Sequence, residues 1–406
     1  MFVSSKKIFR LQDLFLWVVI SGLFLLSGCA STNFALKDTN KAYTHYTLGL
    51  LYDNENKIEE AIEEYKQALA FAPQSSSWIH LRLGVDYSLK KEYTKAIEHI
   101  KLALQSKPED THARLFLALL YTSQGDIEQA IEEYEQLLQQ DPDNFFALSA
   151  LSNLYINQNR FKESIPLYQK MLEIDKNDPF LFYNLGLAYL LSDEVQRAIE
   201  SLEKGLPLSG RNPRFHLLLG LAYFHTKNYE KALENFKQAI ELSYGEIGDL
   251  YYFYMGATYD RLGERKKAEE NLRKAIELNP NNAQACNYLG YIYAEEERNL
   301  DEAEELIKKA IEIEPEEGAY IDSLGWVYYK KSLLLKGKEA EEMLERALKE
   351  IEKAKRLREN DAEIREHLGD IYFRKGMIEK ARKEWEESLR FNPLNERVKE
   401  KLEKIK

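Results

Sequence analysis

The sequence predicts an all-α solenoid, a fold in which short helical units stack one on the next. The first observation is a tyrosine that recurs every 34 to 36 residues, with a final gap of 44. A repeat of this length indicates units that contact only their neighbours and cannot bury an apolar face alone. The recurring tyrosines are Tyr52, Tyr87, Tyr121, Tyr155, Tyr189, Tyr223, Tyr259, Tyr293, Tyr328 and Tyr372.

Two further columns predict a pair of helices in each unit. A leucine or methionine stands four residues before each tyrosine and a small residue follows it directly, as in Leu185 and Gly186 before Tyr189. This spacing places the side chains on one helical face, where the small residue lets a second helix approach closely. Later in each unit comes another small residue, usually with a bulky apolar residue four positions on, as in Ala232 and Phe236. That stripe predicts the facing side of the second helix.

Leu-Gly-x-x-Tyr, then Ala-x-x-x-aromatic, then Pro resembles the tetratricopeptide repeat (TPR), a helix-turn-helix unit. The closing prolines cannot continue the helix before them. They are Pro73, Pro108, Pro142, Pro280, Pro315 and Pro393. The resemblance covers residues 41–393 and implies a right-handed α-solenoid of about ten units. The tryptophan usual near the start of the unit is missing, which suggests looser packing of the first helices.

Residues 394–406 predict a helix that caps the last unit. They carry an apolar stripe at i, i+4 spacing with lysines around it. The stripe consists of Leu394, Val398, Leu402 and Ile405.

The N-terminal residues predict export and lipid attachment. Three basic residues, Lys6, Lys7 and Arg10, precede an apolar stretch that is too short for an easy membrane span. The stretch ends in Leu-Ser-Gly-Cys, with the cysteine at Cys29, and resembles the lipobox of bacterial lipoproteins. That resemblance implies a signal peptide over residues 1–28 and lipid (palmitate and related acyl chains) on Cys29. An ordinary signal peptide, or an uncleaved anchor with a chance cysteine, is the alternative.

The residues directly after Cys29 predict the membrane to which the lipoprotein is sorted. In well-studied lipoprotein sorting, an aspartate at this place retains the protein at the inner membrane, whereas Ala30 and Ser31 stand here. The resemblance therefore implies the outer membrane, facing the periplasm, with the inner membrane or the cell surface as alternatives. We expect residues 29–40 to form a tether between the lipid and the first unit.

Composition and motifs favour a non-enzymatic protein. The formal net charge of −12 argues against nucleic acid as the partner. With Cys29 lipidated, Cys286 has no disulfide partner, and we expect it to be a small buried side chain. The sequence has no zinc-protease, dithiol or nucleotide-binding motif, so we expect no enzymatic activity, no metal and no cofactor. Three histidines share one repeat column, where packing explains them better than metal binding: His45, His80 and His216.

The predicted partner-binding surface is the groove lined by the first helix of each unit, because the resemblance implies that partner peptides lie there. Its lining positions are three before the small residue and one and four after it. In the fifth and sixth units they are apolar and suit an amphipathic helix or extended segment. These residues are Tyr183, Leu187, Leu190, Leu217, Leu221 and Phe224.

The eighth and ninth units place aromatic and polar residues at the lining positions and predict a recognition patch. The patch consists of Asn287, Tyr291, Asp322, Trp326 and Tyr329. For the apolar set, the alternative is that neighbouring first helices simply pack together through these residues.

Two irregularities interrupt the repeat. The ninth unit is ten residues longer between its two small columns and predicts a lengthened hairpin over residues 330–346, turning at Gly337, which is a candidate docking element. Glycines and prolines predict a bend near residues 205–250.

We therefore expect a non-enzymatic interaction scaffold at the bacterial envelope. Comparable lipoproteins assist pilus or secretion machines, barrel assembly, polysaccharide export or peptidoglycan enzymes, and the sequence does not choose among them. The alternative is a regulatory subunit whose groove binds a peptide or glycan and activates an envelope enzyme.

Overall fold

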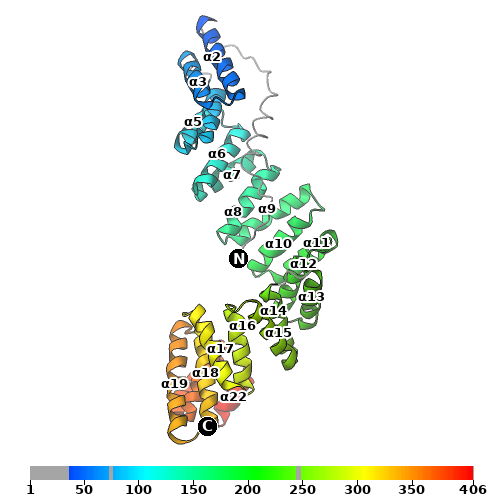
Figure 1. Ribbon diagram of the computed structural model, residues 1–406, viewed down its shortest axis with the longest axis vertical. Coiled ribbons are helices and arrows are strands. Elements are labelled where there is room, and N and C mark those ends of the chain that lie inside the picture. The colour runs from blue at the N-terminus through cyan, green and yellow to red at the C-terminus, as the bar shows by residue number, and fades with distance from the viewer. Residues whose placement is uncertain (1–35, 73–75, 244–247, 406) are drawn as a thin grey trace. The chain divides into compact units, whose positions relative to one another are not determined.

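The computed structural model describes residues 36–72, 76–243 and 248–405. All regular structure in these ranges is helical, with 21 α-helices, one 3-10 helix and no strand. Successive helices pair as hairpins (Figure 1), and the predicted all-α solenoid is confirmed. None of the helices in these ranges is both long and apolar enough to cross a membrane. The predicted signal peptide and Cys29 lie outside the described residues.

The chain divides into two compact units, residues 1–192 and 193–406. Each unit has its own succession of helix pairs. The helices of the first unit are α2 (Leu36–Asn54), α3 (Ile58–Phe71), α4 (Ser77–Leu89), α5 (Tyr93–Ser106), α6 (Thr111–Gln124), α7 (Ile127–Gln140), α8 (Phe145–Asn157), α9 (Phe161–Ile174) and α10 (Pro179–Leu191).

The second unit contains the remaining helices and ends in a short one. They are α11 (Val195–Gly205), η2 (Leu206–Leu208), α12 (Pro213–His225), α13 (Tyr229–Leu242), α14 (Asp249–Arg261), α15 (Arg265–Leu278), α16 (Ala283–Glu295), α17 (Leu300–Ile313), α18 (Gly318–Leu334), α19 (Gly337–Leu357), α20 (Ala362–Arg374), α21 (Ile378–Phe391) and α22 (Glu396–Glu403). The bend expected near residues 205–250 stays a prediction.

The first helix is longer than the tether boundary implied. α2 begins at Leu36, so residues 36–40, which we assigned to the tether, are helical. No glycine or proline occurs between Leu36 and Gly49, so nothing local interrupts the helix there. Leu51 on α2 is 53% exposed, whereas Val327, which stands at the same position of its own repeat, is fully buried. In the described chain no preceding helix pair covers this side of α2.

The tyrosine column joins each helix pair to the one before it. The rings are buried from Tyr87 onward, and several hydroxyls meet a polar side chain located 20 residues earlier, on the second helix of the preceding pair. Tyr155 donates to Glu135 Oε1 at 2.5 Å, and Tyr223 donates to Glu203 Oε1 at 2.6 Å. The column therefore supplies both apolar burial and a directed hydrogen bond at the junctions between pairs.

In several repeats, the position of the missing tryptophan holds a polar residue that is hydrogen-bonded to the second helix of the same pair. His45 Nδ1 lies 2.7 Å from Glu64 Oε2, and an Arg114 guanidinium nitrogen lies 2.7 Å from Glu133 Oε2. Each partner is 19 residues further on, on the second helix of the same pair. The same offset joins His80 to His99, His216 to Asn235 and Arg365 to Glu384. In these units a hydrogen bond thus replaces the packing that the tryptophan would have supplied.

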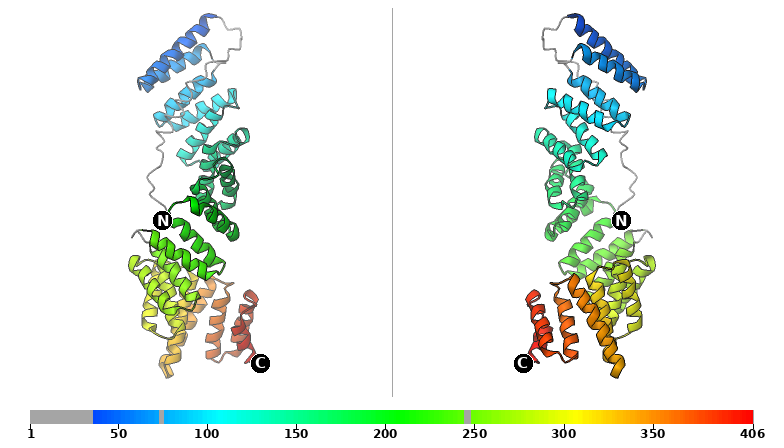
Figure 2. Two further views of the ribbon diagram at one scale, coloured as in Figure 1. Left: turned by 90° about the vertical axis from the view of Figure 1, so that its right-hand side faces the viewer. Right: turned by 90° about the vertical axis from the view of Figure 1, so that its left-hand side faces the viewer.

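The lengthened hairpin consists of α18 and α19, with 17 and 21 residues. The pair is drawn in yellow and orange in Figure 2. Gly337 has a φ of 61°, a left-handed conformation that glycine adopts at little cost, and it lies at the turn between the two helices. Leu334, in the last turn of α18, is exposed.

α22 covers the end of the last helix pair. Val398 is fully buried, and Leu402 and Ile405 pack against the core of the second unit. Leu394, which we expected in the same stripe, is exposed because it precedes Asn395, the residue that caps α22.

The small column lets the two helices of a pair approach closely. A Cβ added to Gly220 would lie 2.5 Å from Cε1 of Phe236, and one added to Gly49 would lie 2.5 Å from Cε1 of Tyr65. Both rings are fully buried and have no free space to move into.

We predict that Gly220→Ala destabilises the second unit by about 1–3 kcal/mol, because overpacking exceeds the gain of about 1 kcal/mol in helix propensity. Urea unfolding followed by circular dichroism measures the change. Gly248→Ala is the control, since the nearest atom to an added Cβ there is 4.0 Å away, and its cost should stay below about 1 kcal/mol. An unchanged or higher unfolding midpoint for Gly220→Ala would contradict the close-approach argument.

Candidate functional site

The apolar lining residues belong to two helices in different compact units. Tyr183, Leu187 and Leu190 lie on α10 in the first unit. Leu217, Leu221 and Phe224 lie on α12 in the second. All six are half-buried, so they contribute both to packing and to the surface.

α10 carries a further apolar residue that the lining rule missed. Phe180 lies one turn before Tyr183 and is 64% exposed, and Leu191 at the other end of the helix is exposed too. Extending the three-residue spacing by one turn toward the N-terminus would have found Phe180. Exposed aromatic side chains of this kind are typical of contact surfaces.

On α12 the apolar set contacts its neighbours edge-on. The ring of Phe224 lies 5.6 Å from that of Tyr229 and 6.3 Å from that of Tyr254, centroid to centroid, in T-shaped arrangements. Part of the Phe224 side chain therefore packs against neighbouring helices, and partner binding by the lining residues stays a prediction.

The predicted recognition patch of the eighth and ninth units is largely sealed. Trp326 on α18 is 7% exposed, and its ring stacks on His367 of α20 with centroids 3.9 Å apart. Tyr329 stacks on Trp326 at 4.9 Å, and the indole Nε1 donates to Glu295 Oε1 at 2.7 Å. The expectation of an exposed tryptophan contact is therefore corrected: the inner helix of the next pair covers it.

Asp322 is also buried, with 5% of its surface exposed. Its Oδ2 accepts a hydrogen bond from His367 Nδ1 at 2.8 Å, whereas its Oδ1 has no donor among the described residues. Half-buried Asn287 likewise has an Oδ1 without a donor in the described chain.

A third contact joins helices that are not neighbours in the repeat. Tyr291 on α16 donates to Glu363 Oε1 on α20 at 2.6 Å, across the intervening α18. We call Tyr291, Asp322, Trp326, Glu363 and His367 the inner cluster. The other four residues come from the first helices α16, α18 and α20 and surround Trp326. Of the predicted patch, only Asn287 and Tyr329 lie at the margin of this cluster.

The acidic side chains around the inner cluster favour the protonated form of His367. Burial disfavours the imidazolium of His367, but attraction to Asp322, the hydrogen bond to it, and the nearby Glu363 and Asp370 outweigh this effect and raise the pKa of His367 to about 9. The histidine is therefore protonated at neutral pH and holds Trp326 in place as a cation against the indole face.

We predict that the His367–Asp322 contact stabilises the second unit fully below about pH 6.5, the ordinary histidine pKa, and that this contribution is lost as pH rises toward 9. NMR titration of the His367 ring should give a pKa near 9 in the wild type and a lower pKa in Asp322→Asn, where the carboxylate that most strongly offsets burial is gone. Asp301→Asn, which removes an exposed carboxylate on α17, should leave the titration unchanged. An equal His367 pKa in wild type and Asp322→Asn would show that the contact does not set it.

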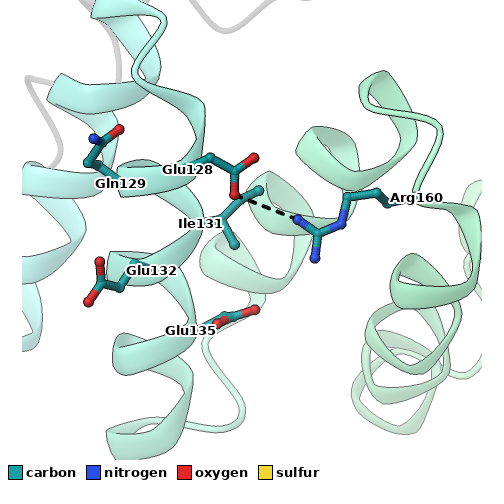
Figure 3. A pocket seen from close by; sticks show the side chains of 6 residues that line it. All are labelled: Glu128, Gln129, Ile131, Glu132, Glu135 and Arg160. Carbon is teal, nitrogen blue, oxygen red and sulfur yellow. Dashed lines mark ion pairs between the residues drawn. The ribbon is translucent and has the colours of Figure 1, made fainter.

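The first unit also has a hollow on its surface (Figure 3). It is lined by Glu128, Gln129, Ile131, Glu132, Glu135 and Arg160. Arg160 lies 3.9 Å from Glu128 Oε2. The lining side chains include no serine, cysteine or histidine that could serve as a nucleophile or base. Solvated charges of this kind form weak surface contacts.

The three column histidines bond within their own helix pairs rather than to one another. Within the described ranges no group of three or more His, Cys, Asp or Glu side chains is placed to hold a metal ion. Cys286 is fully buried, as expected, and burial raises the pKa of its thiol.

Family models described as tetratricopeptide repeats match residues 42–75, 89–154, 121–185, 214–281 and 255–317, which together span more than half of the chain. This chain belongs to the tetratricopeptide-repeat family. A model described as anaphase-promoting complex, cyclosome, subunit 3 also matches residues 157–239. A comparison with curated proteins finds no match.

Several solved structures are similar to this TPR chain. The APC/C hetero-tetramer Cut9–Hcn1 aligns with 97% of this chain and 81% of its own, at 16% identity and a TM-score of 0.54. MamA aligns with 44% of this chain and 96% of its own, at 26% identity and a TM-score of 0.39. YrrB, described as a TPR protein with an unusual peptide-binding site, aligns with 45% of this chain and 91% of its own, at 25% identity and a TM-score of 0.38.

Proposed function

We propose that this TPR protein is a protein-interaction scaffold that lipid on Cys29 holds at the bacterial outer membrane, facing the periplasm. TPR proteins generally act as interaction scaffolds, and exposed apolar side chains on α10 support a contact surface. The lipobox at Cys29 supports the anchor. Its role would be the assembly or regulation of an envelope complex of the kinds named above.

The observation that carries the proposal is the exposed apolar stripe of α10. Phe180 is exposed and Tyr183, Leu187 and Leu190 are half-buried along one helical face. An apolar stripe of that spacing suits the apolar face of a partner helix or an extended segment. The inner cluster, by contrast, already contacts itself, so we propose two separate contact surfaces, α10 in the first unit and Leu217, Leu221 and Phe224 of α12 in the second.

A peptide- or glycan-binding regulatory subunit remains the second candidate. The unpaired Oδ1 atoms of Asn287 and Asp322 favour it, because each is an acceptor that a ligand donor would satisfy. Tyr291 and Glu363 would have to separate before a ligand reached Asp322.

We predict that cells fed radiolabelled palmitate label the wild-type chain and that Cys29→Ser abolishes the label and releases the protein from membranes. Lipid chains contribute about 0.8 kcal/mol per buried methylene, so losing them removes the anchorage. Cys286→Ala, which changes the only other cysteine, should keep the label. Labelled Cys29→Ser protein would rule out attachment at Cys29.

We predict that a photoreactive phenylalanine analogue at position 180 crosslinks one defined envelope protein in intact cells. The matched control is the analogue at position 278, an exposed leucine on the second helix α15. Identical products from both positions, or none from 180, would contradict a partner contact on α10. Crosslinks to glycan alone would favour the regulatory-subunit alternative.

A further inference from the structure

A carboxyl pair joins the first two helix pairs of the chain. Asp53, near the end of α2, and Asp86 on α4 interact with each other, and each carboxyl group affects the pKa of the other. Asp86 is 2% exposed and Asp53 is half-buried. In the next two units the column of Asp86 holds Leu120 and Leu154, which are buried against the preceding helix pair. A carboxyl group thus occupies a position that the repeat otherwise fills with an apolar side chain.

The hydrogen bonds around the pair are incomplete if both groups are ionised. Asp53 Oδ2 accepts from the hydroxyl of Tyr65 on α3 at 2.5 Å. Asp53 Oδ1 and Asp86 Oδ2 are buried and have no donor in the described part of the chain. An ionised carboxylate only accepts hydrogen bonds, whereas a protonated one also donates. A single proton on the pair therefore supplies the donor that the contact between α2 and α4 lacks.

The titratable and charged groups around Asp86 come from three helices. They are Asp53 on α2, the Tyr65 hydroxyl on α3 and Arg82 on α4, and Arg82 is the only cation among them. Burial and the neighbouring Asp53 raise the pKa of Asp86 to about 8, against the opposing effect of Arg82. Two carboxyl groups held this close behave as a dyad that shares one proton.

We propose that Asp53 and Asp86 share one proton at neutral pH and that its loss loosens the packing of the first helix pair on the second. The contact between α2 and α4 is then a proton-sensitive joint. This inference goes beyond the scaffold function and is independent of the lipid on Cys29.

The direction of the pH dependence follows from the linkage between proton binding and folding. The pKa of Asp86 is higher in the folded chain than its ordinary 3.8, so the folded state binds a proton that the separated helices release. The joint is most stable below about pH 4, loses stability as pH rises toward 8, and changes little above that. One linked proton corresponds to about a tenfold change in the opening equilibrium for each pH unit in this window.

Hydrogen exchange with mass spectrometry on the full chain tests this inference. Peptides from residues 42–54 and 77–89 are followed between pH 5 and 9, with rates corrected for intrinsic exchange. We expect their protection to fall about tenfold per pH unit from pH 5 to 7 in the wild type. Asp86→Asn replaces the shared proton with an amide donor and should keep the protection at pH 8 at the level that the wild type has at pH 5.

Two further variants make the result decisive. Asp53→Asn, which removes the neighbouring carboxylate but leaves Asp86 buried, should reduce the slope, and this keeps the test valid if Asp86→Asn does not fold. Asp126→Asn, an exposed carboxyl at the start of α7 that makes no capping hydrogen bond, should retain the wild-type slope. A wild type without a slope, or one whose slope persists in both Asp53→Asn and Asp86→Asn, would overturn the proposal. Recovery of protection at pH 8.5 on adding Mg²⁺ or Ca²⁺ would overturn it in favour of a metal site.

Discussion

The structure depends on the fact that one helix pair cannot bury both of its apolar sides. Within a pair, Gly220 allows Phe236 to seal one interface, but the side that carries the recurring tyrosine is covered only by the preceding pair. The tyrosine hydroxyl then bonds to that pair, as Tyr223 does to Glu203. Burial and a directed hydrogen bond therefore act at the same junction, and a unit removed from the stack loses both.

The sequence contained the information for the fold because the repeat is local. Columns at fixed offsets assign the helices, and Gly337 and Val398 mark a turn and a cap by rules that need no tertiary knowledge. The polar pairs that replace the missing tryptophan were not foreseen. Their common offset of 19 residues, as from Arg114 to Glu133, is visible in the sequence once the two helices are known to face each other.

The candidate site was harder to predict because its burial is set by other units. The lining rule uses the register of a single first helix and correctly places Trp326 on the inner face. It does not take account of α20, the first helix of the next pair, which brings His367 against Trp326 and Glu363 against Tyr291. An aromatic residue that resembled a free contact is thus an internal one, while Phe180, one turn outside the assumed register, is the exposed side chain.

The contact between Tyr291 and Glu363 changes how the end of the stack holds together. In an ordinary solenoid each repeat is coupled only to its neighbours, so helices can be lost one pair at a time from either end. A bond that skips a repeat adds a second-neighbour coupling, which favours the three pairs built on α16, α18 and α20 opening together. Within the described residues no helix pair covers Leu51 of α2, whereas the C-terminal helix pairs of the second unit carry this additional coupling.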